Sequence, residues 1–181
     1  MGTTALAGFP TIVPANVLGK NAPSNKINIG QIGCGRIARS HDLRDTMAYD
    51  AAQIMAVCDL DSNRMKDGKE LVDKFYQEKN GKPRYKGTKM YMDYRDMLND
   101  KDIDAVMIST PDHWHSQPAM EAAMAGKDIY LQKPTSLTVD EGRQLVHAVQ
   151  KNNVILQVGT QQRAMPQFRI AAELVRNGRI G

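Results

Sequence analysis

The feature that most constrains the fold is an apolar run that passes directly into a glycine-rich turn. The run covers residues 27–32 and is rich in isoleucine, which predicts a buried strand. It continues into Gly33-Cys34-Gly35-Arg36-Ile37-Ala38, a G-x-G-x-x-A pattern. The first glycine permits a tight turn, the second lets the backbone approach a pyrophosphate, and the small third residue lets a helix pack on the strand. The pattern predicts a dinucleotide-binding turn with the phosphates at the helix N-terminus.

A second apolar run ends in an acidic residue at the spacing that such a turn requires. The run covers residues 53–58, and Asp59 follows it, about 24 positions after Gly35. In dinucleotide-binding folds an acid about 20 residues beyond the glycines hydrogen-bonds the adenosine ribose. The alternative is a glycine turn without a nucleotide, in which Asp59 only caps a loop. The two signals together favour the dinucleotide site.

Length and charge exclude several other classes. The 181 residues, 41% of them hydrophobic, suffice for one domain of good size and leave no room for a second full domain. The net charge of +4 is spread over interleaved acids and bases, so no nucleic-acid surface is predicted. Cys34 and Cys58 form no C-x-x-C motif and are expected to pack as small apolar side chains. No run of about 18 apolar residues predicts a membrane span.

The first 19 residues carry no charge and are rich in small and apolar side chains. This composition is typical of the apolar and cleavage-proximal part of an export signal without its charged start. The alternative is a disordered or strand-like arm. We expect residues 1–25 to be such a remnant or arm, with Pro23-Ser24-Asn25 as linker, and the protein to be exported to the periplasm rather than cytoplasmic.

The rest of the chain alternates between predicted strands and predicted helices. The strands are expected at 27–32, 53–58, 89–92, 104–109, 128–132 and 154–158. The helices are expected at 36–48, 61–80, 94–99, 118–126, 139–151 and 166–177, with a basic loop at 82–88. The alternation predicts an α/β fold: a doubly wound, mainly parallel six-stranded Rossmann sheet over residues 26–178, with helices on both faces. Ligands of such sheets lie at the carboxyl ends of the strands.

Lys133 is the predicted strand-end residue with the clearest chemical use. It follows the fifth strand and precedes Pro134, which fixes the adjacent backbone. Alcohol oxidation requires loss of the hydroxyl proton, and a positioned acid–base group contributes about 100- to 10,000-fold to such steps. The alternative is a surface lysine in a solvated loop.

The fourth strand leads into a His-x-His pair, His113 and His115, which raises the question of a zinc site. A catalytic zinc needs three protein ligands, and no third ligand with suitable spacing is visible. We therefore predict no metal site. The histidines and Trp114 are expected to pack the loop, cap a helix or form a wall beside the cofactor.

Three motifs, in order, resemble those of the Gfo/Idh/MocA family, the relatives of glucose-fructose oxidoreductase and inositol dehydrogenase. They are the glycine turn 33–38, the run Ser109-Thr110-Pro111-Asp112-His113-Trp114-His115 with Gly126-Lys127 after it, and Gln132-Lys133-Pro134. The resemblance covers residues 26–181. It implies an NAD(P)-dependent oxidoreductase for sugars, cyclitols or related compounds, in which Lys133 contacts the reacting hydroxyl. This chain has Gln132 where the common motif has glutamate, which removes a carboxylate beside the lysine.

The resemblance also implies a second α/β domain after residue 178, of which residues 179–181 would be the start. That domain supplies most substrate contacts, a second catalytic residue and the homo-oligomer interface. We therefore expect the chain to be a fragment that binds NAD(H) and turns nothing over alone. A non-catalytic dinucleotide-binding module, serving as a sensor or a degenerate subunit, is the alternative.

The expected cofactor is NAD rather than NADP, because the carboxylate of Asp59 should repel a 2′-phosphate, although Arg64 nearby leaves some room for one. The predicted catalytic residue is Lys133. The predicted cofactor contacts are Gly33, Cys34, Gly35, Arg36, Ile37, Asp59, Thr110, Pro111, His115, Gln132, Lys133 and Gln161.

Overall fold

The computed structural model describes residues 25–80 and 87–180. The predicted export segment, apart from Asn25, and most of the predicted basic loop lie outside these ranges.

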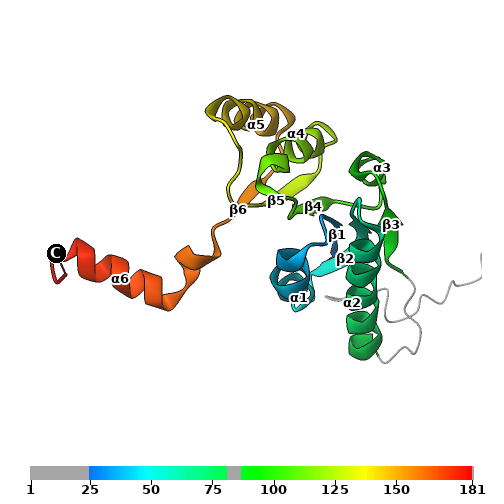
Figure 1. The fold of residues 1–181 in the computed structure, drawn as a ribbon, viewed down its shortest axis with the longest axis horizontal. Coiled ribbons are helices and arrows are strands. Elements are labelled where there is room, and N and C mark those ends of the chain that lie inside the picture. Colours follow the sequence, from blue (N-terminus) through cyan, green and yellow to red (C-terminus); the bar gives the residue numbers. More distant parts are fainter. Residues whose placement is uncertain (1–24, 81–86, 181) are drawn as a thin grey trace, which may run out of the picture.

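The core of the fold is a six-stranded sheet in which every pair of neighbouring strands is parallel (Figure 1). The strand order is β3-β2-β1-β4-β5-β6. The strands are β1 (Ile27–Ile32), β2 (Ala52–Cys58), β3 (Lys89–Tyr91), β4 (Ala105–Ile108), β5 (Asp128–Gln132) and β6 (Leu156–Gly159). The order reverses between β1 and β4, and this switch point opens a crevice at the carboxyl edge. The predicted Rossmann sheet is confirmed.

Helices bury both faces of the sheet against two separate apolar clusters. On one face, α1 (Leu43–Met47) and α2 (Ser62–Asn80) contribute Leu43, Met47, Val72 and Tyr76. The other face is covered by α3 (Tyr94–Leu98), α4 (Ser116–Met124) and α5 (Val139–Asn152). Small residues on α4, Ala119, Ala122 and Ala123, are fully buried and let this helix lie close to the sheet.

Two predicted element starts differ by two residues from those observed. The sixth strand was expected from Val154, but the backbone N–H of Val154 donates to Val149 at the end of α5 and β6 begins only at Leu156. The fourth helix begins at Ser116, two residues before the expected Pro118, because the first turn of a helix needs no N–H from its third residue. A capping box of Thr138 and Glu141, the pattern Thr-x-x-Glu in the sequence, starts α5.

The first crossover helix is not the regular helix that was expected over 36–48. The chain is helical from Arg36, passes through a π-helical turn (η3, Ala38–Asp42) and continues as α1. A π-turn inserts an extra residue and rotates the side chains that follow it. Asp42 and Leu43 are both buried as a result, one against polar strand ends and the other in the apolar cluster.

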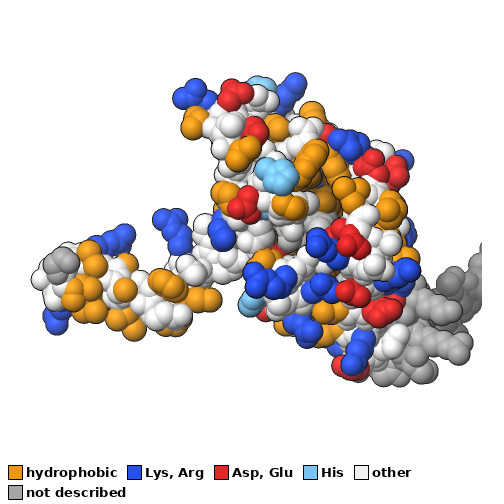
Figure 2. All heavy atoms as spheres, in the orientation of Figure 1, with side chains coloured by type: hydrophobic (Ala, Val, Ile, Leu, Met, Phe, Trp, Pro, Cys, Tyr) orange, Lys and Arg blue, Asp and Glu red, His pale blue; other side chains and the backbone are white. Residues whose placement is uncertain are grey.

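The last helix, α6 (Pro166–Arg176), extends away from the sheet (Figure 1). Its apolar side chains lie at the surface (Figure 2), with Phe168 45% and Ile170 56% exposed. Among the described helices none is both long enough and apolar enough to cross a membrane.

Candidate functional site

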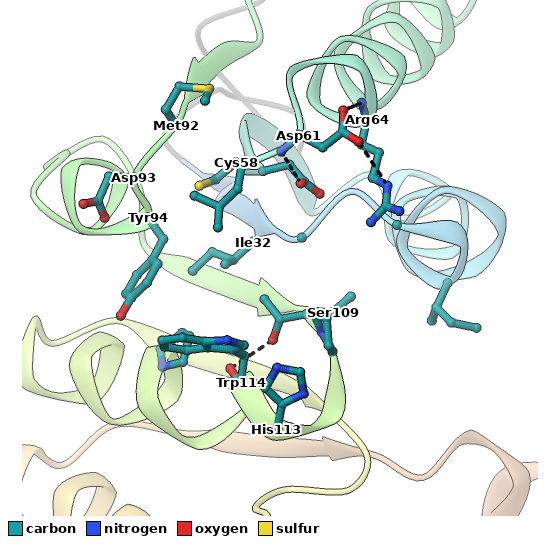
Figure 3. A pocket seen from close by; sticks show the side chains of 18 of the residues that line it. Ile32, Cys58, Asp61, Arg64, Met92, Asp93, Tyr94, Ser109, His113 and Trp114 are labelled. Atoms are coloured by element: carbon teal, nitrogen blue, oxygen red, sulfur yellow. Dashed lines mark hydrogen bonds and ion pairs between the residues drawn. The ribbon is translucent and has the colours of Figure 1, made fainter.

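A cavity of about 740 Å³ opens at the carboxyl ends of β1, β2 and β4 (Figure 3). It lies at the switch point of the sheet, where α/β folds of this kind bind ligands. Its volume is in the range of small-molecule and cofactor sites, which hold about 300–1,000 Å³. The predicted residues that line it are Gly33, Gly35, Arg36, Ile37, Asp59, Thr110 and Pro111.

The glycine turn packs tightly at its first glycine and is open at its second. Gly33 has φ +84°, and a Cβ at this position would lie 2.8 Å from the backbone carbonyl of Ser109. At Gly35 a Cβ would meet no atom within 4 Å. The first N–H groups of a helix have no partner within the helix, so the space beside Gly35 and the helix that begins at Arg36 form a cradle that suits a phosphate anion.

Asp59 is held against the glycine turn by backbone hydrogen bonds. The backbone N–H of Cys34 donates to Asp59 Oδ2 at 2.7 Å, and that of Asp61 donates to Oδ1 at 2.9 Å. A carboxylate has about four acceptor positions, so two remain for ribose hydroxyls. Arg64 lines the same cavity, with its Nε 3.6 Å from Asp61 Oδ2. The acid predicted for the ribose is therefore fixed in place beside the phosphate cradle.

Aromatic and apolar side chains from two loops form the opposite wall of the cavity (Figure 3). Trp114 comes from the loop after β4, where the Oγ1 hydroxyl of Thr110 donates to the Trp114 carbonyl at 3.0 Å. Met92 directly follows β3, and Tyr94 is the first residue of α3. Sequence reasoning did not select Met92 and Tyr94, although the strand-end rule applied to the third strand would have found them.

The cysteine beside the cradle takes part through its backbone and not through its thiol. The Cys34 side chain is fully buried, and burial is the main cause that raises its pKa to about 12. Cys58 is also buried, and its pKa is likewise raised to about 12, first by burial and then by Asp59. Since the thiolate is the reactive form, neither residue is suited to act as a nucleophile.

The remaining predicted residues do not line the cavity. Lys133 is exposed just beyond the end of β5, and exposed Gln161 donates from Nε2 to the Tyr130 hydroxyl at 3.1 Å. His115 is 1% exposed; its Nε2 lies 2.9 Å from the Thr110 carbonyl, and its Nδ1 contacts the Pro134 carbonyl. The ring thus joins the loops after β4 and β5 from inside. The roles of these residues toward a cofactor stay predictions.

A buried polar network lies beneath the same strand ends. Asp42, 5% exposed, accepts a hydrogen bond from Ser109 Oγ at 2.6 Å and another from Gln132 Nε2 at 2.7 Å. Gln31 on β1 extends the network, since its Nε2 donates to Ser109 Oγ at 3.1 Å. Burial raises the pKa of Asp42 above its ordinary 3.8, outweighing the hydrogen bonds from Ser109 and Gln132, which lower it. Sequence reasoning missed Asp42.

The raised pKa of Asp42 predicts a pH dependence with a definite sign. The folded chain holds this proton more tightly than the unfolded chain, so the contribution to stability is complete below 3.8 and is lost as the pH rises through the raised folded pKa. We therefore compare the free energy of unfolding of the wild-type chain with that of Asp42→Asn. The wild-type value minus the variant value should grow as the pH is lowered from about 7 to about 4. Urea unfolding of both proteins at each pH measures this difference. A difference that is flat, or larger at neutral pH, would contradict the assignment.

Among residues 25–80 and 87–180, no group of three or more His, Cys, Asp or Glu side chains is placed to hold a metal ion. The polar groups that do lie together are backbone N–H donors beside Gly35 and the acceptor oxygens of the Asp59 carboxylate. Together they fit an anionic group bound next to a sugar hydroxyl.

A known protein family and known proteins match most of this chain. The family described as "Oxidoreductase family, NAD-binding Rossmann fold" (GFO_IDH_MocA) matches residues 27–160. The uncharacterized oxidoreductase YrbE of Bacillus subtilis is 35% identical over 158 residues, which are 87% of this chain and 42% of that protein.

Two solved structures extend the comparison. Scyllo-inositol dehydrogenase from Lactobacillus casei, with bound NAD(H) and scyllo-inositol, matches with a TM-score of 0.70 and 26% identity, over 86% of this chain and 42% of that one. KijD10, a 3-ketoreductase from Actinomadura kijaniata in complex with NADP and TDP-benzene, matches with a TM-score of 0.73 and 24% identity, over 87% and 44%. The second likeness shows the fold alone. The chain spans less than half the length of these relatives.

Proposed function

Because the chain belongs to the Gfo/Idh/MocA family of oxidoreductases with an NAD-binding Rossmann fold, we propose that it is the cofactor-binding domain of an enzyme acting on a sugar, a cyclitol or a related hydroxyl or keto compound. The observation that carries the proposal is the pairing of an open phosphate cradle at Gly35 with the fixed carboxylate of Asp59 in one cavity. The Lactobacillus casei relative binds NAD(H) and scyllo-inositol, which agrees with this class of ligands.

In this proposal each part of the cavity has a separate task. The amides beside Gly35 hold the pyrophosphate, and Asp59 accepts hydrogen bonds from the adenosine ribose. The bound nicotinamide cofactor supplies the capacity to accept or donate a hydride. Lys133, at the end of β5, holds or releases the proton of the reacting hydroxyl.

The absence of Lys133 from the cavity lining favours a second candidate function, a dinucleotide-binding module without catalysis. The two candidates share the cradle and Asp59. They differ in whether a protein that carries this chain turns over a substrate, and in whether such turnover depends on Lys133.

Asp59 should also determine the choice between NAD and NADP. We expect the chain to bind NAD⁺ more tightly than NADP⁺, since the carboxylate repels a 2′-phosphate. Asp59→Ala should weaken NAD⁺ binding about tenfold or more, because hydrogen bonds to a charged group are lost, and should narrow the gap to NADP⁺. Isothermal titration calorimetry of the 181-residue chain with both dinucleotides measures these effects.

Glu70→Ala is the matched control, because it removes the same charge from an exposed position on α2, outside the cavity lining. It should leave both affinities unchanged. Tighter binding of NADP⁺ by the wild-type chain would refute the assigned preference. If the wild-type chain bound neither dinucleotide, the proposed function itself would fail.

A further inference from the structure

The Asp42 carboxylate is placed by an irregular feature of the first helix. The π-turn that ends at Asp42 brings this side chain beneath the sheet edge, where it is 5% exposed. Both of its oxygens are occupied by donors, Ser109 Oγ on Oδ2 and Gln132 Nε2 on Oδ1. Two acceptor oxygens facing two donors are the pattern of an ionised carboxylate. Because burial disfavours this charge, the two hydrogen bonds compensate for the lost water, and they tie both donor residues to one carboxylate.

The two residues bonded to Asp42 end two neighbouring strands. Ser109 follows β4 and precedes Thr110, and Gln132 ends β5 and precedes Lys133. The strands pair in parallel up to Ile108 and Leu131, so their hydrogen-bonded ladder stops just before these residues. From there Asp42 joins the two ends on one side, and the His115 ring joins the Thr110 and Pro134 carbonyls on the other.

These strand ends belong to one half of the cofactor crevice. Asp59 and the end of β2 lie on the other side of β1, where the adenosine is expected. A dinucleotide that crosses the crevice therefore brings its nicotinamide toward the ends of β4 and β5. Asp42 touches residues of that half, while its own side chain does not line the cavity.

We propose that Asp42 is a positioning residue for the nicotinamide half of the site: by holding Ser109 and Gln132, its carboxylate sets the separation of the loops that carry Thr110 and Lys133. This inference rests on the proposed function. It also accounts for Gln132, which stands where the common family motif has glutamate. The carboxylate that the Glu-Lys-Pro motif would place at position 132 lies instead across a 2.7 Å hydrogen bond, on the first helix.

The test compares NAD⁺ with ADP-ribose, which lacks only the nicotinamide. Both ligands are titrated into the 181-residue chain by calorimetry. Asp42→Ala should weaken NAD⁺ binding about tenfold, through the loss of two charge-assisted hydrogen bonds, and change ADP-ribose binding less than about twofold. If Asp42 only stabilised the fold, its loss would reduce the affinity for both ligands by the same factor. Equal losses, or no loss for either ligand, would overturn the inference.

An exchange of the two side chains keeps the test valid if Asp42→Ala does not fold. Gln132→Glu alone places a second carboxylate next to that of Asp42, and the repulsion between them should lower the NAD⁺ affinity about tenfold. The double variant, Asp42→Asn with Gln132→Glu, again has one carboxylate and one amide at this contact. The double variant should return the ratio of NAD⁺ to ADP-ribose affinity to within about twofold of the wild-type ratio. A double variant no better than Gln132→Glu alone would count against the inference.

Asp45→Asn is the matched control, since it removes an exposed acid of the same helix without touching either strand end. It should leave both affinities unchanged. The outcomes also separate the two proposals. A wild-type chain that binds neither ligand refutes the proposed function, whereas a wild-type chain that binds both, with Asp42 variants that do not discriminate between them, refutes only the role of Asp42.

Discussion

Replacing Lys133 by alanine is expected to reduce turnover about 100- to 10,000-fold in a protein that carries this chain and acts on a substrate. The residue lies just beyond the end of β5, exposed and next to the strand ends that Asp42 joins. If it transfers the proton of the reacting hydroxyl, its loss removes an interaction made in the transition state. The loss should therefore appear in kcat rather than in cofactor affinity. NAD⁺ affinity should change by less than about twofold, because the phosphate and ribose contacts are elsewhere.

Steady-state kinetics together with cofactor titration measure both quantities. Lys151→Ala is a suitable control, since it removes an exposed lysine from the end of α5. Turnover that survives in Lys133→Ala would remove the catalytic assignment of Lys133. A protein that carries this chain, binds NAD⁺ and turns over no sugar or cyclitol would favour the dinucleotide-binding module without catalysis.

Gly33→Ala is expected to destabilise the fold severely, by about 2–5 kcal/mol, from the cost of a left-handed backbone and of overpacking. The native Gly33 has φ +84°, and the Cβ of an alanine here would lie 2.8 Å from the Ser109 carbonyl and 2.9 Å from the Thr110 nitrogen. These neighbours are backbone atoms of an adjacent strand end, so no side-chain rotation relieves the contact. A domain of this size has about 5–15 kcal/mol in total, so the variant should melt about 4–20 °C lower.

Gly35→Ala is the matched comparison, with the opposite expected result. Its Cβ would meet no atom within 4 Å, so the melting temperature should stay close to that of the wild-type chain. The same methyl group would occupy the cradle proposed for the pyrophosphate and should weaken NAD⁺ binding about tenfold or more. Thermal unfolding and calorimetry on both variants test the pair. A stable Gly33→Ala, or a Gly35→Ala that binds NAD⁺ like the wild-type chain, would contradict these roles.

Much of the fold could be predicted because its signals are local. The passage from an apolar run into the glycine turn depends on residues that are adjacent in sequence, and the capping box at Thr138 is contained in four residues. The alternation of strands and helices then restricts the topology, since crossovers between parallel strands are right-handed. The rule that ligands bind at the carboxyl ends of strands led directly to Asp59 and Thr110 in the cavity.

The site was predicted less completely, since its second half depends on contacts between distant residues. Nothing in the helical pattern of residues 36–48 signals a π-turn, so Asp42 could not be placed inside the protein. The partners of the His115 ring were also not predictable, since they are backbone carbonyls of Pro134 and Thr110, 19 and 5 residues away along the chain. Met92 and Tyr94 lie beyond a strand of only three residues, a signal too short to mark its carboxyl end as part of a site.

Local sequence signals were enough to predict the Rossmann sheet, the glycine turn after its first strand and the acid that lies against this turn. These features follow from hydrophobic periodicity, from the conformational freedom of glycine and from the spacing between neighbouring elements. Only the tertiary structure decided which polar groups meet beneath the strand ends. Asp42 meets Ser109 and Gln132 across 67 and 90 residues of chain, and such a pairing depends on how the first helix packs against the sheet, which no local pattern encodes.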